Sequence, residues 1–164
     1  MNWREDIQAS KYKGINMDIT KLDQKNKCTL AIRLAEKASS YLQERNAKRL
    51  INEAIEIGWR WVHTEEISGE VLYDFLDNEE NGFTLFQETE KDERIVRAWD
   101  CIIDAVAYVS RAAYEKEGIK YLPEPVEIVD DNIFTHMIQS LILCDNMERE
   151  YIENEYQKCL EEVE

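Results

Sequence analysis

Apolar residues recur at helical spacing along most of the chain, and this periodicity predicts one helix after another. In each predicted helix they return every three or four positions, as on the buried face of an amphipathic helix. Residues 1–27 are polar, rich in lysine and without a clean period, so we expect an N-terminal arm or a short frayed helix there. A single helical domain then occupies 28–164, with amphipathic helices expected at about 29–42, 46–62, 68–77, 131–144 and 147–163.

Capping residues mark several of these boundaries. Asn46 and Ser68 stand where the second and third helices begin, and both are favoured N-cap residues. The apolar register slips after 144, and 145–148 (Asp-Asn-Met-Glu) has the form of a capping box. We therefore expect a break between the last two helices at this point.

The longest predicted helix, at about 90–117, differs from the others because it is apolar on most of its sides. Residues 89–92 (Thr-Glu-Lys-Asp) resemble a capping box that would open it, and Gly118 follows where a C′ glycine would end it. Residues 123–125 (Pro-Glu-Pro) predict an extended connection to the next helix. A helix apolar on most sides is surrounded by others, so the sequence predicts an all-α, single-domain bundle of roughly five to seven helices around this central helix.

Composition supports this fold class. Only 5 glycines and 2 prolines occur in 164 residues, which argues against a turn-rich β architecture. The four cysteines are scattered without Cys-x-x-Cys spacing, as in a cytosolic protein with reduced thiols. The first residues include acids where a signal peptide has an apolar run, and no segment has 18 uninterrupted apolar residues. We therefore expect a cytoplasmic protein.

Charge is distributed unevenly along the chain, whose net charge is −15. Residues 1–60 hold 12 Lys/Arg and 8 Asp/Glu, whereas 61–164 hold 8 and 27. Lysine and arginine are absent from 61–90, which has nine acids, and from 121–148, which has six. Such a field repels nucleic acids and anionic membranes and accelerates encounter with a basic protein. We expect a basic protein partner, and neither a nucleic-acid nor a membrane partner.

The usual catalytic motifs find little support. A carboxylate-bridged di-metal bundle needs Glu-x-x-His, and neither His63 nor His136 has a glutamate three residues before it. We expect His63 on the surface near a helix end and His136 beside the core. There is no Gly-x-Ser-x-Gly and no phosphate-binding glycine loop. No catalytic residue, metal ion or cofactor is predicted.

Carboxylates alone could hold magnesium, as in helical nucleotide pyrophosphohydrolases with Glu-x-x-Glu and Glu-x-x-Asp on two helices. Comparable spacings occur at Glu53 and Glu56 and at Asp74 and Asp77. With 35 acids in the chain, such spacings arise by chance, and all four residues lie opposite the apolar stripes. A solvated face is the preferred interpretation.

Asp100 and Asp104 lie one turn apart on the central helix. Two buried like charges would raise one carboxyl pKa, as is common at acid–base sites. Arg97 and Arg111 lie on the same line of the helix and can neutralise them. A structural ion-pair network is favoured, and a functional role is left open.

Trp59 and Trp61 lie two positions apart on the second helix, so both cannot face the core. Trp61 fits the apolar stripe. Trp59 is expected to be half-exposed beside the acidic stretch 61–90, where packing on a neighbouring helix is the simpler outcome and a binding hot spot the alternative. The predicted partner-binding residues are Trp59, Glu65, Glu66, Glu70, Asp74, Asp77, Glu79 and Glu80.

Three segments resemble the all-helical immunity proteins of bacterial polymorphic toxin systems. They are 58–61 (GWRW), 98–108 (AWDCIIDAVAY) and 121–131 (YLPEPVEIVDD), and the resemblance covers roughly 28–145. It implies a cytosolic protein that binds and blocks a cognate toxin domain, often a nuclease. It carries no fixed binding motif, so the residues named above rest on charge and exposure.

The leading hypothesis is therefore a non-enzymatic immunity protein whose acidic surface covers the basic substrate groove of a bacterial toxin. A DNA-mimic regulatory protein is the second hypothesis, and a magnesium-dependent nucleotide pyrophosphohydrolase is the third. The identity of the toxin, the acidic face that binds it and the oligomeric state stay open at this stage.

Overall fold

The computed structural model describes residue 15 and residues 17–162, and the regular secondary structure of this part of the chain is helical throughout. A short 3₁₀ helix, η1 (Ile19–Lys21), precedes eight α-helices: α2 (Gln24–Ser39), α3 (Arg45–Thr64), α4 (Gly69–Leu76), α5 (Phe83–Thr89), α6 (Glu93–Glu117), α7 (Glu124–Glu127), α8 (Ile133–Cys144) and α9 (Glu148–Glu161). The predicted all-α class is confirmed, with one α-helix more in the described residues than the upper expectation of seven. None of these helices is long and apolar enough to cross a membrane.

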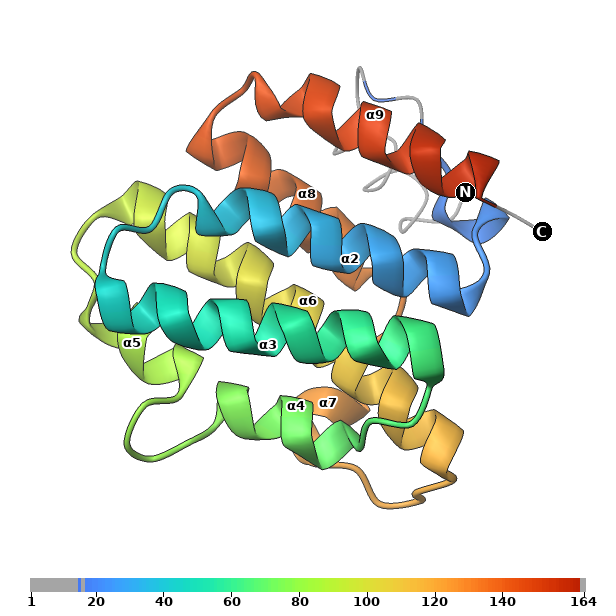
Figure 1. Ribbon diagram of the computed structural model, residues 1–164. Helices are drawn as coiled ribbons and strands as arrows, with labels where there is room; N and C mark the ends of the chain where they lie inside the picture. Colours follow the sequence, from blue (N-terminus) through green and yellow to red (C-terminus); the bar gives the residue numbers. More distant parts are fainter. Residues whose placement is uncertain (1–14, 16, 163–164) are drawn as a thin grey trace, which may run out of the picture.

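α6 is the centre of the bundle, as its apolar pattern predicted. It packs against α2, α3, α4, α5, α7 and α8, and in Figure 1 it passes behind α2 and α3. Side chains from several sides of α6 are fully buried, among them Trp99, Ile102 and Ala113. The helix ends at Gly118, which adopts the predicted left-handed conformation with φ of 76°.

α5 is a helix that the sequence pattern did not predict, and it changes where α6 begins. Phe83 and Phe86 pack on Trp99, with ring centroids 5.3 and 5.6 Å away. These contacts come from the tertiary structure, so seven residues become helical without a long amphipathic stripe. The prediction that 89–92 open the central helix is wrong, because Thr89 ends α5 and Asp92 is the N-cap of α6.

α7 is the second helix that was not predicted, and it replaces part of the extended connection expected at 123–125. Pro125 lies in the first turn, where a helix needs no backbone N–H donor. Arg111 of α6 then donates to the carbonyls of Val126 and Val129, both at 3.2 Å, and to that of Glu127. A side chain from α6 therefore holds the end of this short helix.

Other boundaries agree more closely with the capping pattern. Ser68 caps α4 as predicted, and the expected break at 145–148 separates α8 from α9. The second long helix begins earlier than expected, with Glu44 rather than Asn46 as its N-cap. The first long helix also begins early, at Gln24, after Asp23 as N-cap.

The described part of the predicted N-terminal arm packs on the bundle. Ile15, Ile19 and Leu22 are buried, and the Tyr156 hydroxyl of α9 donates to the carbonyl of Asp18 at 2.7 Å. Residues 1–14 and 16 of that arm lie outside the described residues. The predicted division into an arm and a domain at 27/28 stays a prediction.

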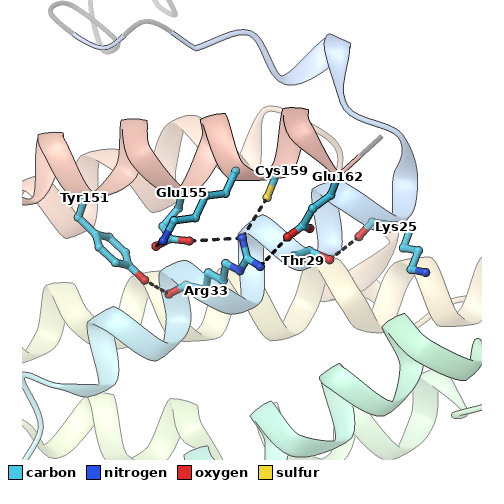
Figure 2. A network of polar contacts seen from close by, with 8 residues as sticks. Lys25, Thr29, Arg33, Tyr151, Glu155, Cys159 and Glu162 are labelled. Carbon is cyan, nitrogen blue, oxygen red and sulfur yellow. Dashed lines mark hydrogen bonds and ion pairs between the residues drawn. The ribbon is translucent and has the colours of Figure 1, made fainter. Parts of the chain in front are cut away.

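α9 is fastened to α2 by a polar network around Arg33 (Figure 2). The guanidinium of Arg33 lies 3.4 Å from Glu155 and 3.1 Å from Glu162, and the Tyr151 hydroxyl donates to the Arg33 carbonyl at 3.1 Å. Lys37, one turn further along α2, lies 3.8 Å from buried Glu148. Three acids of this segment, Glu148, Glu155 and Glu162, therefore attach it to α2.

Candidate partner-binding site

α4 is held close to the second half of α6 through Gly69. The Gly69 N–H donates to the Glu117 carboxylate at 2.7 Å, and its carbonyl accepts from the Ser110 hydroxyl at 2.9 Å. A Cβ atom at this position would lie 2.5 Å from the Tyr114 ring, closer than real Cβ atoms approach. The missing side chain therefore lets α4 lie directly on α6, with its opposite side in solvent.

That outer side carries a group of acids that we call the α4 acidic face. Leu72 and Leu76 are buried beneath it. All but one of its carboxylates have neither an ion pair nor a side-chain hydrogen bond with a described residue; the exception is Asp77. The α4 acidic face consists of Glu66, Glu70, Asp74, Asp77, Glu79 and Glu80, all exposed.

The carboxylates of Asp77 and Glu65 each contact another side chain of the bundle. The Tyr73 hydroxyl donates to Asp77 at 3.0 Å, and burial together with this carboxylate raises the pKa of Tyr73. Glu65 ends α3 in a left-handed conformation with φ of 56°, and its carboxylate lies 3.1 Å from the Lys116 amine. Glu65 is therefore already paired with a cation, whereas the acids of the α4 acidic face pair with none in the described part of the chain.

Trp59 lies on α3 and is not part of the α4 acidic face. It is half-buried, as expected, and stacks on His63 with ring centroids 6.4 Å apart. Its indole is hydrogen-bonded to Glu36 of α2, which opposes the rise in the Glu36 pKa that burial causes. α3 lies between α2 and α4 in Figure 1 and contacts both. The hydrogen bond to Glu36 places the indole of Trp59 on the α2 side of α3.

A pocket of about 490 Å³ opens beside the C-terminal end of α4, between α4, α6, α8 and the segment around α7. Most of its wall is apolar, and Ile103 and Ala107 of α6 contribute to it together with Leu76. Ile128 stands at the pocket with 77% of its surface exposed. Among the eight predicted binding residues, Asp77 lines this pocket.

Asp104 and His136 face each other in the wall of the pocket and form an ion pair from α6 to α8. Burial raises the pKa of Asp104, and the hydrogen bond and charge of His136 oppose that rise. The expectation that Arg111 neutralises Asp104 is wrong, since His136 takes that place and Arg111 binds the end of α7. The expected position of His136 beside the core is also wrong, because its side chain is 51% exposed.

Asp100, one turn before Asp104, follows the predicted arrangement. Its carboxylate lies 3.2 Å from Arg97 and accepts from the Gln87 amide at 2.8 Å. It does not line the pocket. The two aspartates of the central helix therefore have different surroundings, and the structural ion-pair interpretation fits Asp100 well.

The carboxylate pairs considered for magnesium do not converge. Glu53 is paired with Arg49 at 3.1 Å on α3, and Glu56 lies 3.5 Å from Arg60. Across the described residues, no group of three or more His, Cys, Asp or Glu side chains is placed to hold a metal ion. The described geometry therefore offers no support for the pyrophosphohydrolase hypothesis.

Sequence reasoning missed the pocket because its wall comes from four separate segments. The available signal was Ile128, an apolar residue in a segment with six acids and no lysine or arginine. From the sequence alone, Ile128 would be interpreted as an ordinary core residue.

The family comparison covers the helices that form this site. The family model of the immunity protein Imm6 matches residues 26–144, from the first turn of α2 to the end of α8, and excludes α9. The search of curated proteins and the search of solved structures found no match. Because the match spans most of the chain, this protein belongs to the Imm6 family of immunity proteins.

Proposed function

We propose that this protein binds and neutralises a cognate bacterial toxin domain with a basic surface, and that the α4 acidic face makes the first contact. Membership of the Imm6 family is the observation that carries the inhibitory role. The carboxylates of the α4 acidic face, which pair with no described cation, support the finer statement about charge. A net charge of −15 adds a long-range field of the same sign.

The proposed toxin is a nuclease, because an enzyme that binds nucleic acid exposes cations to the phosphate backbone. Carboxylates spaced along α4 and the following turn would occupy those cations in place of phosphates. Opposite fields can raise association rates to about 10⁸–10⁹ M⁻¹s⁻¹ at low salt. Rapid capture matters if the toxin and its inhibitor share the cytoplasm of the producing cell, which is where we propose the protein acts, without catalysis of its own.

We expect a neighbouring gene to encode the toxin domain, and the experiment uses that domain purified as a catalytically inactive variant. We expect stoichiometric binding, protection of cells that express the active toxin, and an association rate that falls at least about tenfold from 50 to 500 mM salt. Absence of both binding and protection would contradict the proposed function. A rate independent of salt would contradict the electrostatic part alone.

Two quadruple variants with equal change in charge locate the contact. The test variant neutralises Glu70, Asp74, Glu79 and Glu80 as Gln or Asn. The control neutralises Glu53, Glu56, Glu150 and Glu161, which are exposed on α3 and α9. We expect the test variant alone to lose most of the salt-dependent rate, whereas an equal loss in both would mean that the overall charge acts and not this face.

If the wild type instead bound many unrelated basic proteins and competed with DNA for each of them, the DNA-mimic hypothesis would be preferred.

A further inference from the structure

The pocket beside α4 combines an apolar wall with acidic groups. We call it the α4–α8 pocket. Its three carboxylates come from different segments, Asp77 from the end of α4, Asp104 from α6 and Asp130 from the connection before α8. No lysine or arginine is among the described residues that line it, and His136 is its basic group. The pocket is therefore complementary to a group that has an apolar body and a positive end.

Its size is also informative. A volume of about 490 Å³ lies within the range of roughly 300–1,000 Å³ that is typical of small-ligand pockets. Such a space exceeds the needs of a single water and accommodates a long side chain. Exposed Ile128 adds apolar surface that becomes buried when the pocket is filled.

We propose that the α4–α8 pocket receives one arginine side chain of the toxin, with its aliphatic stem on Ile103 and Ala107 and its guanidinium against Asp104. This inference rests on the proposed function and specifies the chemistry of the partner at one point of the interface. The α4 acidic face would steer the basic surface of the toxin towards this protein, and the pocket would then bind the arginine side chain of that surface. Buried arginines that fill pockets are frequent hot spots of protein interfaces.

Arginine suits this pocket better than lysine. The side chain of Asp104 is only 15% exposed, so a cation that reaches it must give up water. A guanidinium is more weakly hydrated than an ammonium and presents five donors in a planar fork. Asp104 already accepts from His136, yet a carboxylate has about four acceptor positions and can take a second donor.

A test that does not need the toxin uses n-butylguanidinium as a probe of the arginine side chain. Amide and methyl NMR shifts of the full-length protein are followed during titration with this probe, with n-butylammonium and with neutral n-butylurea. We expect saturable shifts at Ile103, Ala107 and Ile128, with half-saturation in roughly the millimolar range for the guanidinium. The ammonium should bind several times more weakly, and the urea more weakly still.

Asp104→Asn and Asp100→Asn form a matched pair of variants. Both residues lie on α6 one turn apart, and both are paired with a basic side chain, but only Asp104 lines the pocket. Asp104→Asn should remove the preference for guanidinium over urea, and Asp100→Asn should keep it. Ile128→Arg is the second test variant, because this exposed residue can change without disturbing the core, and its own guanidinium should compete with the probe.

Equal shifts with guanidinium, ammonium and urea, or shifts outside the pocket alone, would overturn the proposal. Pocket shifts that appear when the protein is concentrated without a probe would assign the pocket to a second copy of the chain and would also overturn it. With the toxin domain, Asp104→Asn should weaken binding about 10- to 100-fold and Asp100→Asn less than about threefold.

The two proposals fail separately. Protection of cells without probe binding would remove the arginine assignment and leave the immunity function. Probe binding without toxin binding would remove the immunity function and leave a pocket that selects guanidinium.

Discussion

The segment 66–80, which carries the α4 acidic face, and the segment 148–162, which forms α9, each hold six acids, but the structure uses them differently. On α9, Glu155 and Glu148 are buried and lie beside Arg33 and Lys37 of α2. On the α4 acidic face, the carboxylates point into solvent, and no described cation pairs with them. A high density of acid in a sequence can therefore attach a helix to its neighbour or leave carboxylates exposed to solvent, and we propose that the exposed group contacts a partner.

The difference arises from cations that lie far away in the chain. Arg33 is more than a hundred residues from Glu155 in the chain, and the packing of α9 on α2 brings the guanidinium and the carboxylate to 3.4 Å from each other (Figure 2). α4 instead lies on α6, whose nearby cation Lys116 pairs with Glu65. The family match includes α4 and excludes α9.

The largest expected effect tests the attachment of α9. Arg33→Met should lower the free energy of unfolding by about 3 kcal/mol, because it leaves Glu155 buried with Lys158 as its one ion-pair partner among the described residues. Arg49→Met is the control, since its pair with Glu53 is exposed and lies within one helix, and should cost less than about 0.5 kcal/mol. Denaturant unfolding measures both, and equal costs would mean that the Arg33 network adds no more than a surface pair.

A second prediction uses Cys159 to report whether α9 stays closed. The thiol is fully buried, and burial raises its pKa to about 11; Arg33 opposes this rise, and Glu162 and Glu155 add to it. At pH 8 it should therefore have about 100-fold less thiolate than an ordinary thiol of pKa 9.0, and each pH unit of increase below 11 should raise the thiolate about tenfold.

Iodoacetamide labelling followed by mass spectrometry measures this reactivity at each cysteine. Loss of Arg33 by itself raises the Cys159 pKa, but we expect the exposure of the thiol as α9 opens to outweigh this effect, so Arg33→Met should accelerate labelling of Cys159. Labelling of Cys101, in the centre of the bundle, should be unchanged. Equally rapid labelling of Cys159 and of an unfolded control in the wild type would show that α9 is not held in place.

The close packing of α4 on α6 gives the third prediction. Gly69→Ala should cost about 2 kcal/mol of stability, because its new methyl group would overlap the Tyr114 ring and the Ser110 carbonyl. Gly118→Ala is the comparison, since no atom lies within 4 Å of the added Cβ and only the positive φ opposes it, at about 1 kcal/mol. Thermal unfolding measures both, and an unchanged Gly69→Ala would contradict the close contact of α4 with α6.

The last prediction has the smallest expected effect and compares the α4 acidic face with α9 directly. Neutralising Glu70, Asp74, Glu79 and Glu80 together should change the free energy of unfolding by less than about 0.5 kcal/mol, because exposed unpaired acids contribute little. Glu155→Gln alone should cost more than this, because it removes the carboxylate that pairs with Arg33 and Lys158. The reverse order would show that the α4 acidic face is a structural element.

Several features of the fold could be predicted because they depend on neighbouring residues. The caps at Ser68 and Gly118 and the break at 145–148 require only local backbone and side-chain contacts. The central position of α6 followed from an apolar pattern on most of its sides. α5 and α7 could not be predicted in this way, since Trp99 and Arg111 of α6 stabilise them from outside their own segments.

The sequence by itself determined the helical class, the central helix, the excess of acid and the likeness to immunity proteins, which the family match confirmed. Only the tertiary structure decided which acids are paired, that Trp59 turns to α2, and that Asp104 meets His136 in the wall of a pocket. The physical reason is the distance along the chain over which each kind of interaction acts. Helix periodicity and capping act over a few residues, whereas an ion pair or a pocket wall requires groups within a few ångströms that the chain brings from distant segments.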